Sequence, residues 1–310
     1  MKLIPRTLSS QKSRLFALAL AAATLLLSAA QTRAELIYGL TTGNALVSFD
    51  SATPGTATAL VPISGVGGET IFDIDIRPAD GLLYGFSSAG RLYSINPITG
   101  LATLNASLTG TSLDPNATRF SIDFNPTVDR LRIVSNTGQD LRLTPGSGVT
   151  TIDTNLNGAS TRAVSVAYTN NDTNPATGTT LFYIDTPGGA ATVYNTSNPN
   201  GGVMSLVGPA GVNSTDNVGF DISGLTSIAY ASFSSPTGLA SMLYQINLAN
   251  GAATLVGTIG APGLFIRGIA APINAPETGH TVILLALAAG VLFAARRGMI
   301  SRRLEGNGRA

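Results

Sequence analysis

Between residues 35 and 275 the chain is a succession of short runs in which apolar residues alternate with polar ones or are β-branched. Each run ends in Gly, Pro, Asn or Asp. Such runs are typical of β-strands separated by turns. No stretch of this region shows a strong apolar period near 3.6 residues, which an amphipathic helix would need. The pattern therefore predicts an all-β domain.

The strands recur as a unit of about 45 residues with four strands in each unit. The clearest copies run from Phe72 to Leu104, Phe120 to Ile152, Val164 to Leu206 and Phe220 to Val256. A unit of this length with four strands is the size of one propeller blade. The repeat therefore predicts a β-propeller.

The two ends of this region supply one further blade. Residues 36–61 contain three strands, Leu36–Leu40, Ala45–Phe49 and Thr56–Leu60, that match the second to fourth strands of a blade. Residues 265–270 match a first strand with nothing after it. Pairing the two would close a ring and protect its open sheet edges. We predict a β-propeller domain over residues 35–272, with five four-stranded blades closed by a C-terminal strand that joins the N-terminal blade. Six or seven blades, an open sandwich or a β-solenoid are the alternatives.

The first 34 residues have the order of a secretory signal peptide. Residues 1–14 carry four basic side chains and no acid, and an apolar run follows from Leu15 to Ala30. Small residues at Thr32 and Ala34 then suit a cut after Ala34. An uncut membrane anchor is the alternative, but about 16 apolar residues are few for a spanning helix. We predict that residues 1–34 are removed.

The C-terminal end carries a second apolar segment followed by arginines. We predict a linker and sorting motif at 273–280, a transmembrane sorting helix at 281–297 and a basic cytoplasmic tail at 298–310. Arginines after an apolar helix are a stop-transfer signal. The apolar stretch is short for a permanent span, so a helix held only until processing fits, and an anchor that is never cut is the alternative. The motif residues are Pro276, Glu277, Thr278, Gly279, Arg296 and Arg297.

The order of Pro-Glu, short apolar helix and Arg pair resembles the PEP-CTERM and VPDSG-CTERM sorting segments that exosortases process in Gram-negative bacteria. The motif Ala275–Gly279 departs from both, since Thr-Gly replaces the second Pro of the first type, and Glu and Thr replace Asp and Ser of the second. It is also similar to the sortase signal of Gram-positive walls, with Ala275 where Leu is expected. The resemblance implies an exosortase-like peptidase as partner, transient anchoring in the inner membrane, and delivery to the cell surface, outer membrane or extracellular matrix.

The repeat region resembles the bacterial domain-of-unknown-function 4394 family over nearly all of residues 36–271. That family implies a secreted, propeller-like domain with no established activity, so it transfers no catalytic residue. The resemblance rests on Leu36–Thr42, Ile74–Pro78, Asp123–Arg132, Asn136–Arg142, Ala167–Asn170 and Gly219–Ile222.

Composition narrows the chemistry of the domain. Between residues 35 and 275 eight Arg and no Lys stand against fifteen Asp and Glu, which leaves a net charge of −7 and no basic patch for nucleic acid. The chain has no Cys, its one His is His280 in the tail, and no Lys follows residue 12. A Ser–His–Asp triad, His metal ligands, thiol catalysis and Schiff-base chemistry are therefore excluded from the domain.

Carboxylate oxygens are still available for binding or catalysis. The first strands of propeller blades line the central channel, so acids on these strands would lie there together. Converging carboxylates there could hold Ca²⁺ or act as an acid/base pair. In the alternative they cap turns or pair with Arg77, Arg130 or Arg132. The predicted channel residues are Asp73, Asp75, Asp123, Asp221 and Arg267.

Two functions follow as hypotheses. The first is an exported, non-catalytic surface or matrix propeller that binds polysaccharide or protein through loops at one face, without a cofactor. The second is a secreted hydrolase or lyase that uses the channel carboxylates, with or without Ca²⁺. The sequence favours the first, because the side chains most often used in catalysis are missing.

Overall fold

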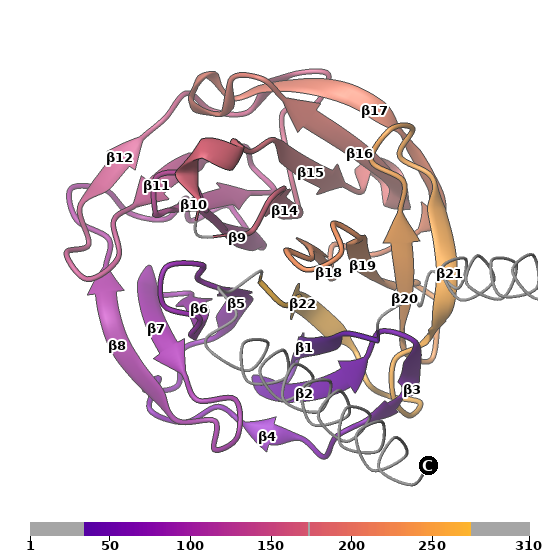
Figure 1. Ribbon diagram of the computed structural model, residues 1–310. Helices are drawn as coiled ribbons and strands as arrows, with labels where there is room; N and C mark the ends of the chain where they lie inside the picture. The colour runs from indigo at the N-terminus through magenta and orange to yellow at the C-terminus, as the bar shows by residue number, and fades with distance from the viewer. Residues whose placement is uncertain (1–33, 173, 274–310) are drawn as a thin grey trace, which may run out of the picture.

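Five small β-sheets form a ring in the computed structural model, which describes residues 34–172 and 174–273 (Figure 1). The predicted signal peptide up to residue 33 lies outside the described residues. So do the sorting motif, the predicted sorting helix and the basic tail, beyond residue 273. Within the described part, no helix combines the length and the apolar character needed to cross a membrane.

Each sheet is one blade of four consecutive antiparallel strands, counted outward from the axis. Blade 1 contains β22 (Ile266–Ala270), β1 (Leu36–Thr41), β2 (Ala45–Asp50) and β3 (Thr53–Ala57), with β4 (Val61–Pro62) also paired to β2. Blade 2 contains β5 (Ile71–Ile76), β6 (Leu83–Ser87), β7 (Arg91–Ile95) and β8 (Ala102–Ser107). Blade 3 contains β9 (Phe120–Asn125), β10 (Arg130–Ser135), β11 (Asp140–Leu143) and β12 (Thr150–Ile152).

The last two blades follow the same order. Blade 4 contains β14 (Ser165–Tyr168), β15 (Leu181–Asp185), β16 (Ala190–Thr196) and β17 (Val203–Asn213), with β13 (Asn157–Gly158) added in parallel to β17. Blade 5 contains β18 (Val218–Ile222), β19 (Ala229–Ser234), β20 (Ser241–Ile246) and β21 (Ala253–Thr258). Short 3₁₀ turns lie at Pro175–Thr177, Pro187–Gly189 and Pro199–Gly201.

The ring closes where the two ends of the domain meet. Strand β22 pairs antiparallel with β1, and Tyr38 lies opposite Ala270 and Leu40 opposite Gly268. The five-bladed ring and its closure by a C-terminal strand are thus confirmed, and the open sandwich and the solenoid are wrong. Closure supplies β1 with a partner along an edge that would otherwise be open.

Apolar side chains pack between the blades. Five buried clusters occur, and each joins two neighbouring blades of the ring. In the cluster at the closure, Ile37 and Phe49 of blade 1 pack with Ile269 of the closing strand and with Tyr230 and Leu243 of blade 5. Burial of apolar side chains between neighbouring blades therefore holds the ring together without disulfides.

Two strand predictions are wrong in detail. The predicted strand Thr56–Leu60 overlaps β3 only at Thr56 and Ala57, and β4 follows as a separate strand that also pairs with β2. The pairing of β3 with β2 shifts register between Phe49 and Asp50. Thr58 then bonds Ser48 through its N–H and through its hydroxyl. Strand β13 and the length of β17 were not predicted, since a two-residue bridge leaves no pattern in the sequence.

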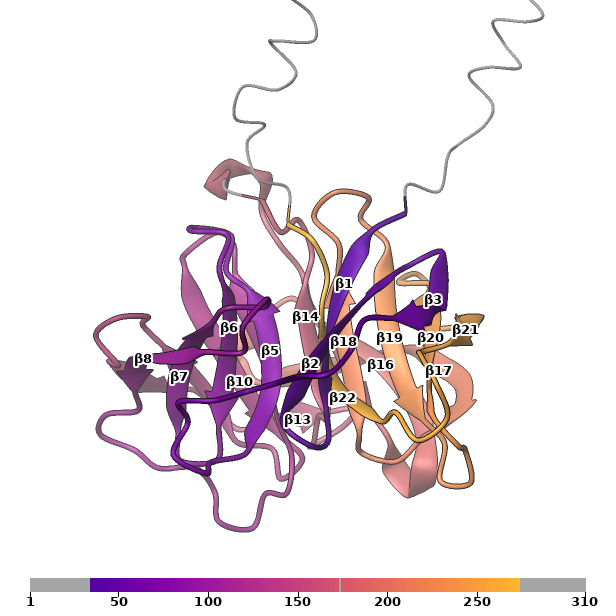
Figure 2. The ribbon, with the colours of Figure 1, turned by 90° about the horizontal axis from the view of Figure 1, so that it is seen from below.

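The innermost strands β5, β9, β14, β18 and β22 surround the axis side by side (Figure 1). They run in the same direction, so the loops that follow them leave at one face, which we call the exit face. Strand β22 ends and β1 begins at this face (Figure 2). The loops of the exit face are residues 77–82, 126–129, 169–180 and 223–228.

Candidate functional site

Side chains of the inner strands fill the axis in two layers, because alternate residues of a strand point the same way. The second layer lies nearer the exit face and holds three of the predicted channel carboxylates. The first layer contains Asp73, Ser121, Ser165, Gly219 and Gly268, and the second contains Asp75, Asp123, Ala167, Asp221 and Ala270.

Carboxylates of the second layer connect three of the blades to the blade that follows. The inner strands pair on one side only, so their remaining N–H groups need acceptors. The carboxylates accept from them: Asp75 Oδ2 from Phe124 N (2.7 Å), Asp123 Oδ1 from Tyr168 N (3.1 Å) and Asp221 Oδ2 from Ala271 N (2.6 Å). These aspartates therefore support the ring as well as lining the axis.

The three carboxylates also meet one another. One oxygen each from Asp75, Asp123 and Asp221 lies within 4.8 Å of the others. The residues are 2%, 1% and 1% exposed. Within the described residues no arginine lies within salt-bridge distance of any of the three. Three acidic groups therefore share a buried space without a cationic side chain.

The predicted alternative, in which these aspartates pair with nearby arginines, is wrong for this layer. Arg77 pairs with Asp80 and Asp129, and Arg132 pairs with Asp140 and Asp153. Arg130 bonds the Thr151 hydroxyl instead. These three arginines thus find partners within their own blades and in neighbouring blades, but not among the second-layer aspartates.

Burial makes the acids of the second layer hard to ionise. Burial, and then the charge of Asp221, raise the pKa of Asp75 well above its ordinary value. Burial and the charge of Asp75 do the same to the pKa of Asp123. Burial raises the pKa of Asp221 to about 7, although the N–H groups of Ala271 and Ile222 oppose the rise. The cluster therefore favours bound protons or a bound cation.

Asn171 completes this layer, and sequence reasoning missed it. Blade 4 carries Ala167 in the second layer and so provides no oxygen there. Asn170 has left-handed backbone (φ 57°), a conformation that Asn tolerates, and it turns the chain just after β14. The buried Asn171 amide then donates to Ile222 O at 3.0 Å and lies 3.4 Å from Asp221 Oδ1. Four of the five blades thus contribute a polar side chain to this layer, three through a carboxylate and blade 4 through the Asn171 amide.

Arg119 closes the other end of the axis, and sequence reasoning missed this residue too. It lies directly before β9 and is 4% exposed. Its guanidinium donates to one backbone carbonyl from each of the other four blades, namely Phe72, Val164 (3.2 Å), Val218 (2.8 Å) and Arg267. A single charged side chain therefore seals the ring, and its position before a predicted first strand was the only signal.

The first layer separates Arg119 from the acidic cluster. Asp73 Oδ2 accepts from Ser121 Oγ at 2.5 Å and lies 3.9 Å from Arg119. Burial raises the pKa of Asp73 to about 6, although the Arg119 charge opposes the rise. Arg267 does not join the second layer, because its side chain donates to Ile71 O (3.3 Å) and Thr42 O (2.6 Å). The five predicted channel residues thus divide between two ends of the axis.

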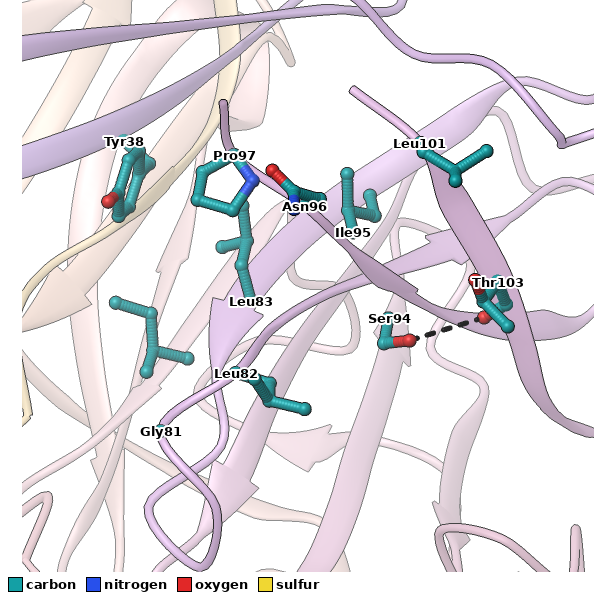
Figure 3. Close-up of a pocket in the computed structure, with 11 residues that line it drawn as sticks. Tyr38, Gly81, Leu82, Leu83, Ser94, Ile95, Asn96, Pro97, Leu101 and Thr103 are labelled. Atoms are coloured by element: carbon teal, nitrogen blue, oxygen red, sulfur yellow. Dashed lines mark hydrogen bonds between the residues drawn. The ribbon is translucent and has the colours of Figure 1, made fainter. Parts of the chain in front are cut away.

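Several surface pockets lie at the exit face, and a further pocket of about 600 Å³ lies away from it, between residues 55–60 and 260–264. Four pockets of about 480, 440, 410 and 300 Å³ each include residues from a loop that follows an inner strand. Figure 3 shows the largest of these four, in which Tyr38 of blade 1 lies across from Asn96 and Pro97 of blade 2, and Ser94 bonds Thr103 O. Hydroxyl and amide side chains recur in all four: Ser94, Asn96, Thr103, Asn125, Thr127, Thr179, Thr180, Thr196, Ser227, Gln245 and Asn247.

A closed ring of five four-stranded antiparallel sheets around a packed axis defines a five-bladed β-propeller. The chain belongs to the family described as Domain of unknown function (DUF4394), whose model matches residues 45–270. The predicted family is therefore confirmed for the repeat region. The resemblance of the tail to exosortase sorting segments stays a prediction.

Solved structures with distant similarity were also found. One is hydrazine synthase of Kuenenia stuttgartiensis, at 12% identity and TM-score 0.38 over 63% of this chain and 53% of that one. Another is a structural genomics protein of unknown function from Bacteroides thetaiotaomicron, at 12% identity and TM-score 0.45 over 74% of this chain and 59% of that one. The chain thus spans between half and three fifths of their lengths. No curated protein matches the chain.

Proposed function

We propose that this protein is an exported, non-catalytic propeller that binds neutral polysaccharide at the cell surface or in the extracellular matrix through its exit face. The observation that carries the proposal is the contrast between its two polar regions. The acids of the axis are buried, whereas pockets in which hydroxyl and amide side chains recur open along one face. The charged residue that lines these pockets, Asp129, is paired with Arg77.

The axial side chains are better placed to hold the ring together than to hydrolyse a polymer. An acid/base pair must come within hydrogen-bond reach of the substrate. Asp75 and Asp123 are at most 2% exposed, and each already accepts an N–H from the next blade. Arg119 fills the opposite end of the axis. These contacts favour the binding hypothesis over the carboxylate hydrolase or lyase.

The exit face suits a ligand with hydroxyl groups and little charge. Asn, Thr, Ser and Gln side chains can both donate to and accept from sugar hydroxyls. Exposed aliphatic side chains lie beside them, with Leu82 and Val128 each more than half exposed. Apolar contact at a polar rim is a common feature of binding surfaces. A protein partner is the other outcome that the test below distinguishes.

Export is supported by the sequence of the two ends. The predicted signal peptide and sorting segment would deliver the ring outside the inner membrane, and an exosortase-like peptidase would release it there. Intact producing cells treated with a non-specific protease should lose the propeller, while a cytosolic marker survives. A propeller protected until the cells are lysed would contradict the proposal. Cells that lack the peptidase should retain a larger membrane-bound form, and exported material ending at Ala310 would exclude processing.

Binding is tested with surface polysaccharide purified from the producing cells. The double variant Leu82→Glu, Val128→Glu should weaken binding at least tenfold, because it places two charges at the exit face. Leu239→Glu is the matched control, since Leu239 is exposed on the loop between β19 and β20 at the opposite face. Retention of a protein rather than a glycan, or equal loss in the control, would contradict the proposal. Turnover of glycosides or lactones that disappears in Asp123→Asn would favour the hydrolase.

A further inference from the structure

The acidic cluster of the second layer is not balanced by the protein around it. Asp75, Asp123 and Asp221 are buried together, and within the described residues none forms a salt bridge. The first-layer acid Asp73 has Arg119 at 3.9 Å, but Arg119 hydrogen-bonds carbonyls at the far end of the axis. Buried like charges without a counter-charge are costly. Something other than a side chain must therefore neutralise the cluster.

Two oxygens of the axial side chains lack hydrogen-bond partners, and Asn171 contacts the cluster through its Nδ2, 3.4 Å from Asp221 Oδ1. Asp75 Oδ1 and Asn171 Oδ1 are buried and accept no hydrogen bond from the described residues. Each residue is 2% exposed. Asn171 is a neutral side chain from a loop, so it is evidence independent of the acids. Buried polar atoms are rarely left unpaired in folded proteins. Protons on the carboxyl groups could serve Asp75, whereas a cation held by both side chains would give each of the two oxygens a partner.

We infer that this axial cluster is a binding site for one Ca²⁺ ion, with Asp75, Asp123, Asp221 and Asn171 as its side-chain ligands. The inference is separate from the proposed function, since it concerns the ring and not its location or its partner. Calcium takes six to eight oxygens at about 2.3–2.6 Å. Two oxygens on opposite sides of the ion are then about 4.8 Å apart. One carboxylate oxygen from each of the three aspartates lies within 4.8 Å of those of the other two.

The ligand set fits Ca²⁺ better than Mg²⁺. Three carboxylates and one amide oxygen are the ligand types of calcium sites. Oxygens that already accept an N–H keep a lone pair for the ion. Magnesium requires near-ideal octahedral geometry at about 2.0–2.1 Å and keeps several waters. The second-layer side chains are held by β5, β9 and β18 at positions that the ring dictates, so a metal that accepts irregular geometry is favoured.

The test measures Ca²⁺ binding by the purified full-length protein in mild detergent. Calorimetric titration after EDTA treatment should show one site per chain. One millimolar free Ca²⁺ should raise Tm by about 5 °C or more relative to EDTA, because a ligand of the folded state stabilises that state. Equal concentrations of Mg²⁺ should produce less than half of this shift. No heat and no shift with Ca²⁺ would overturn the inference, and an equal response to Mg²⁺ would overturn the choice of calcium.

Substitutions locate the site. Asp123→Asn and Asn171→Ala should each weaken Ca²⁺ binding more than tenfold. Asp185→Asn is the matched control, because Asp185 is equally buried but pairs with Arg162 away from the axis, and it should bind Ca²⁺ as the wild type does. Unchanged affinity in both Asp123→Asn and Asn171→Ala would place the ion elsewhere and overturn the inference.

A variant that should strengthen Ca²⁺ binding keeps the test decisive even where a weakening variant fails to fold. Asn171→Asp adds a fourth carboxylate to the cluster. It should lower Tm in EDTA and bind Ca²⁺ more tightly than the wild type, so the Tm shift produced by Ca²⁺ should grow. If protons alone neutralise the cluster, Ca²⁺ would not rescue this variant, and that result would overturn the inference even if Asp123→Asn fails to fold.

Discussion

Replacing Arg119 by Met should destabilise the propeller by about 3–5 kcal/mol. The guanidinium donates to carbonyls of Phe72, Val164, Val218 and Arg267. A hydrogen bond to a charged group contributes about 1.5–3 kcal/mol to stability. The cost of burying the guanidinium offsets much of what the four hydrogen bonds contribute together. Removal of one partner from a buried charged network typically costs about 3–5 kcal/mol. Met retains most of the buried stem, so the loss measures the hydrogen bonds rather than a cavity.

The assay is urea unfolding followed by far-ultraviolet circular dichroism, since the chain has no Trp to report by fluorescence. For a domain of this size the loss corresponds to a fall in Tm of roughly 6–20 °C. Arg119→Lys should recover only part of the stability, because an ammonium group cannot reproduce the planar fork of donors.

Arg91→Met is the matched control. Arg91 is an exposed arginine that pairs with Glu69, and its loss should have little effect, as expected of surface ion pairs. A loss below about 1 kcal/mol in Arg119→Met, or one equal to that in Arg91→Met, would refute the idea that one side chain seals the axis.

Three further predictions concern the same ring. Gly268→Ala should lower the free energy of unfolding by about 1–3 kcal/mol through overpacking, because the new Cβ would lie 2.1 Å from Asp73 Oδ1. Gly43→Ala is the control: its Cβ would make only an ordinary contact at 3.8 Å, so its stability in urea unfolding should not change. Ile269→Ala, at the ring closure, should lower the free energy of unfolding by about 2–5 kcal/mol. Ile98→Ala, at an 84% exposed site, should change it by no more than about 0.5 kcal/mol. Equal losses in the two variants would mean that closure contributes little to stability. In EDTA the stability should fall as pH rises from about 4 to 7, because burial raises the pKa of Asp221 to about 7 and the folded state then binds a proton that the unfolded chain releases near its ordinary value of about 4. Asp75, Asp123 and Asp73, whose pKa values burial also raises, add to the same trend, so a urea midpoint that stays flat or rises across this window would contradict it.

Local pattern determined the architecture of this protein. Alternation over four to seven residues defines a strand, and its recurrence about every 45 residues defines a blade, so neither depends on distant contacts. The N-terminal blade lacks a first strand before Leu36, and the C-terminal end has an unpaired first strand at Ile266–Ala270. These two features predicted the closure, because the C-terminal strand can complete the N-terminal blade. The acids of the inner strands were also evident, since Asp75, Asp123 and Asp221 occupy the same place in the repeat.

Only the tertiary structure decided how the axis is filled. Arg119 and Asn171 lie just outside their strands, where the repeat assigns no facing direction, and their partners come from blades as far as 148 residues away. The division of Asp73 and Asp75 between two layers, and the pairing of arginines away from the axis, likewise depend on the registers of five separate strands. A side chain's partner across a ring is set by how the blades pack. For that reason strand positions could be predicted from the sequence, whereas the roles of Arg119 at one end of the axis and of Asn171 at the other could not.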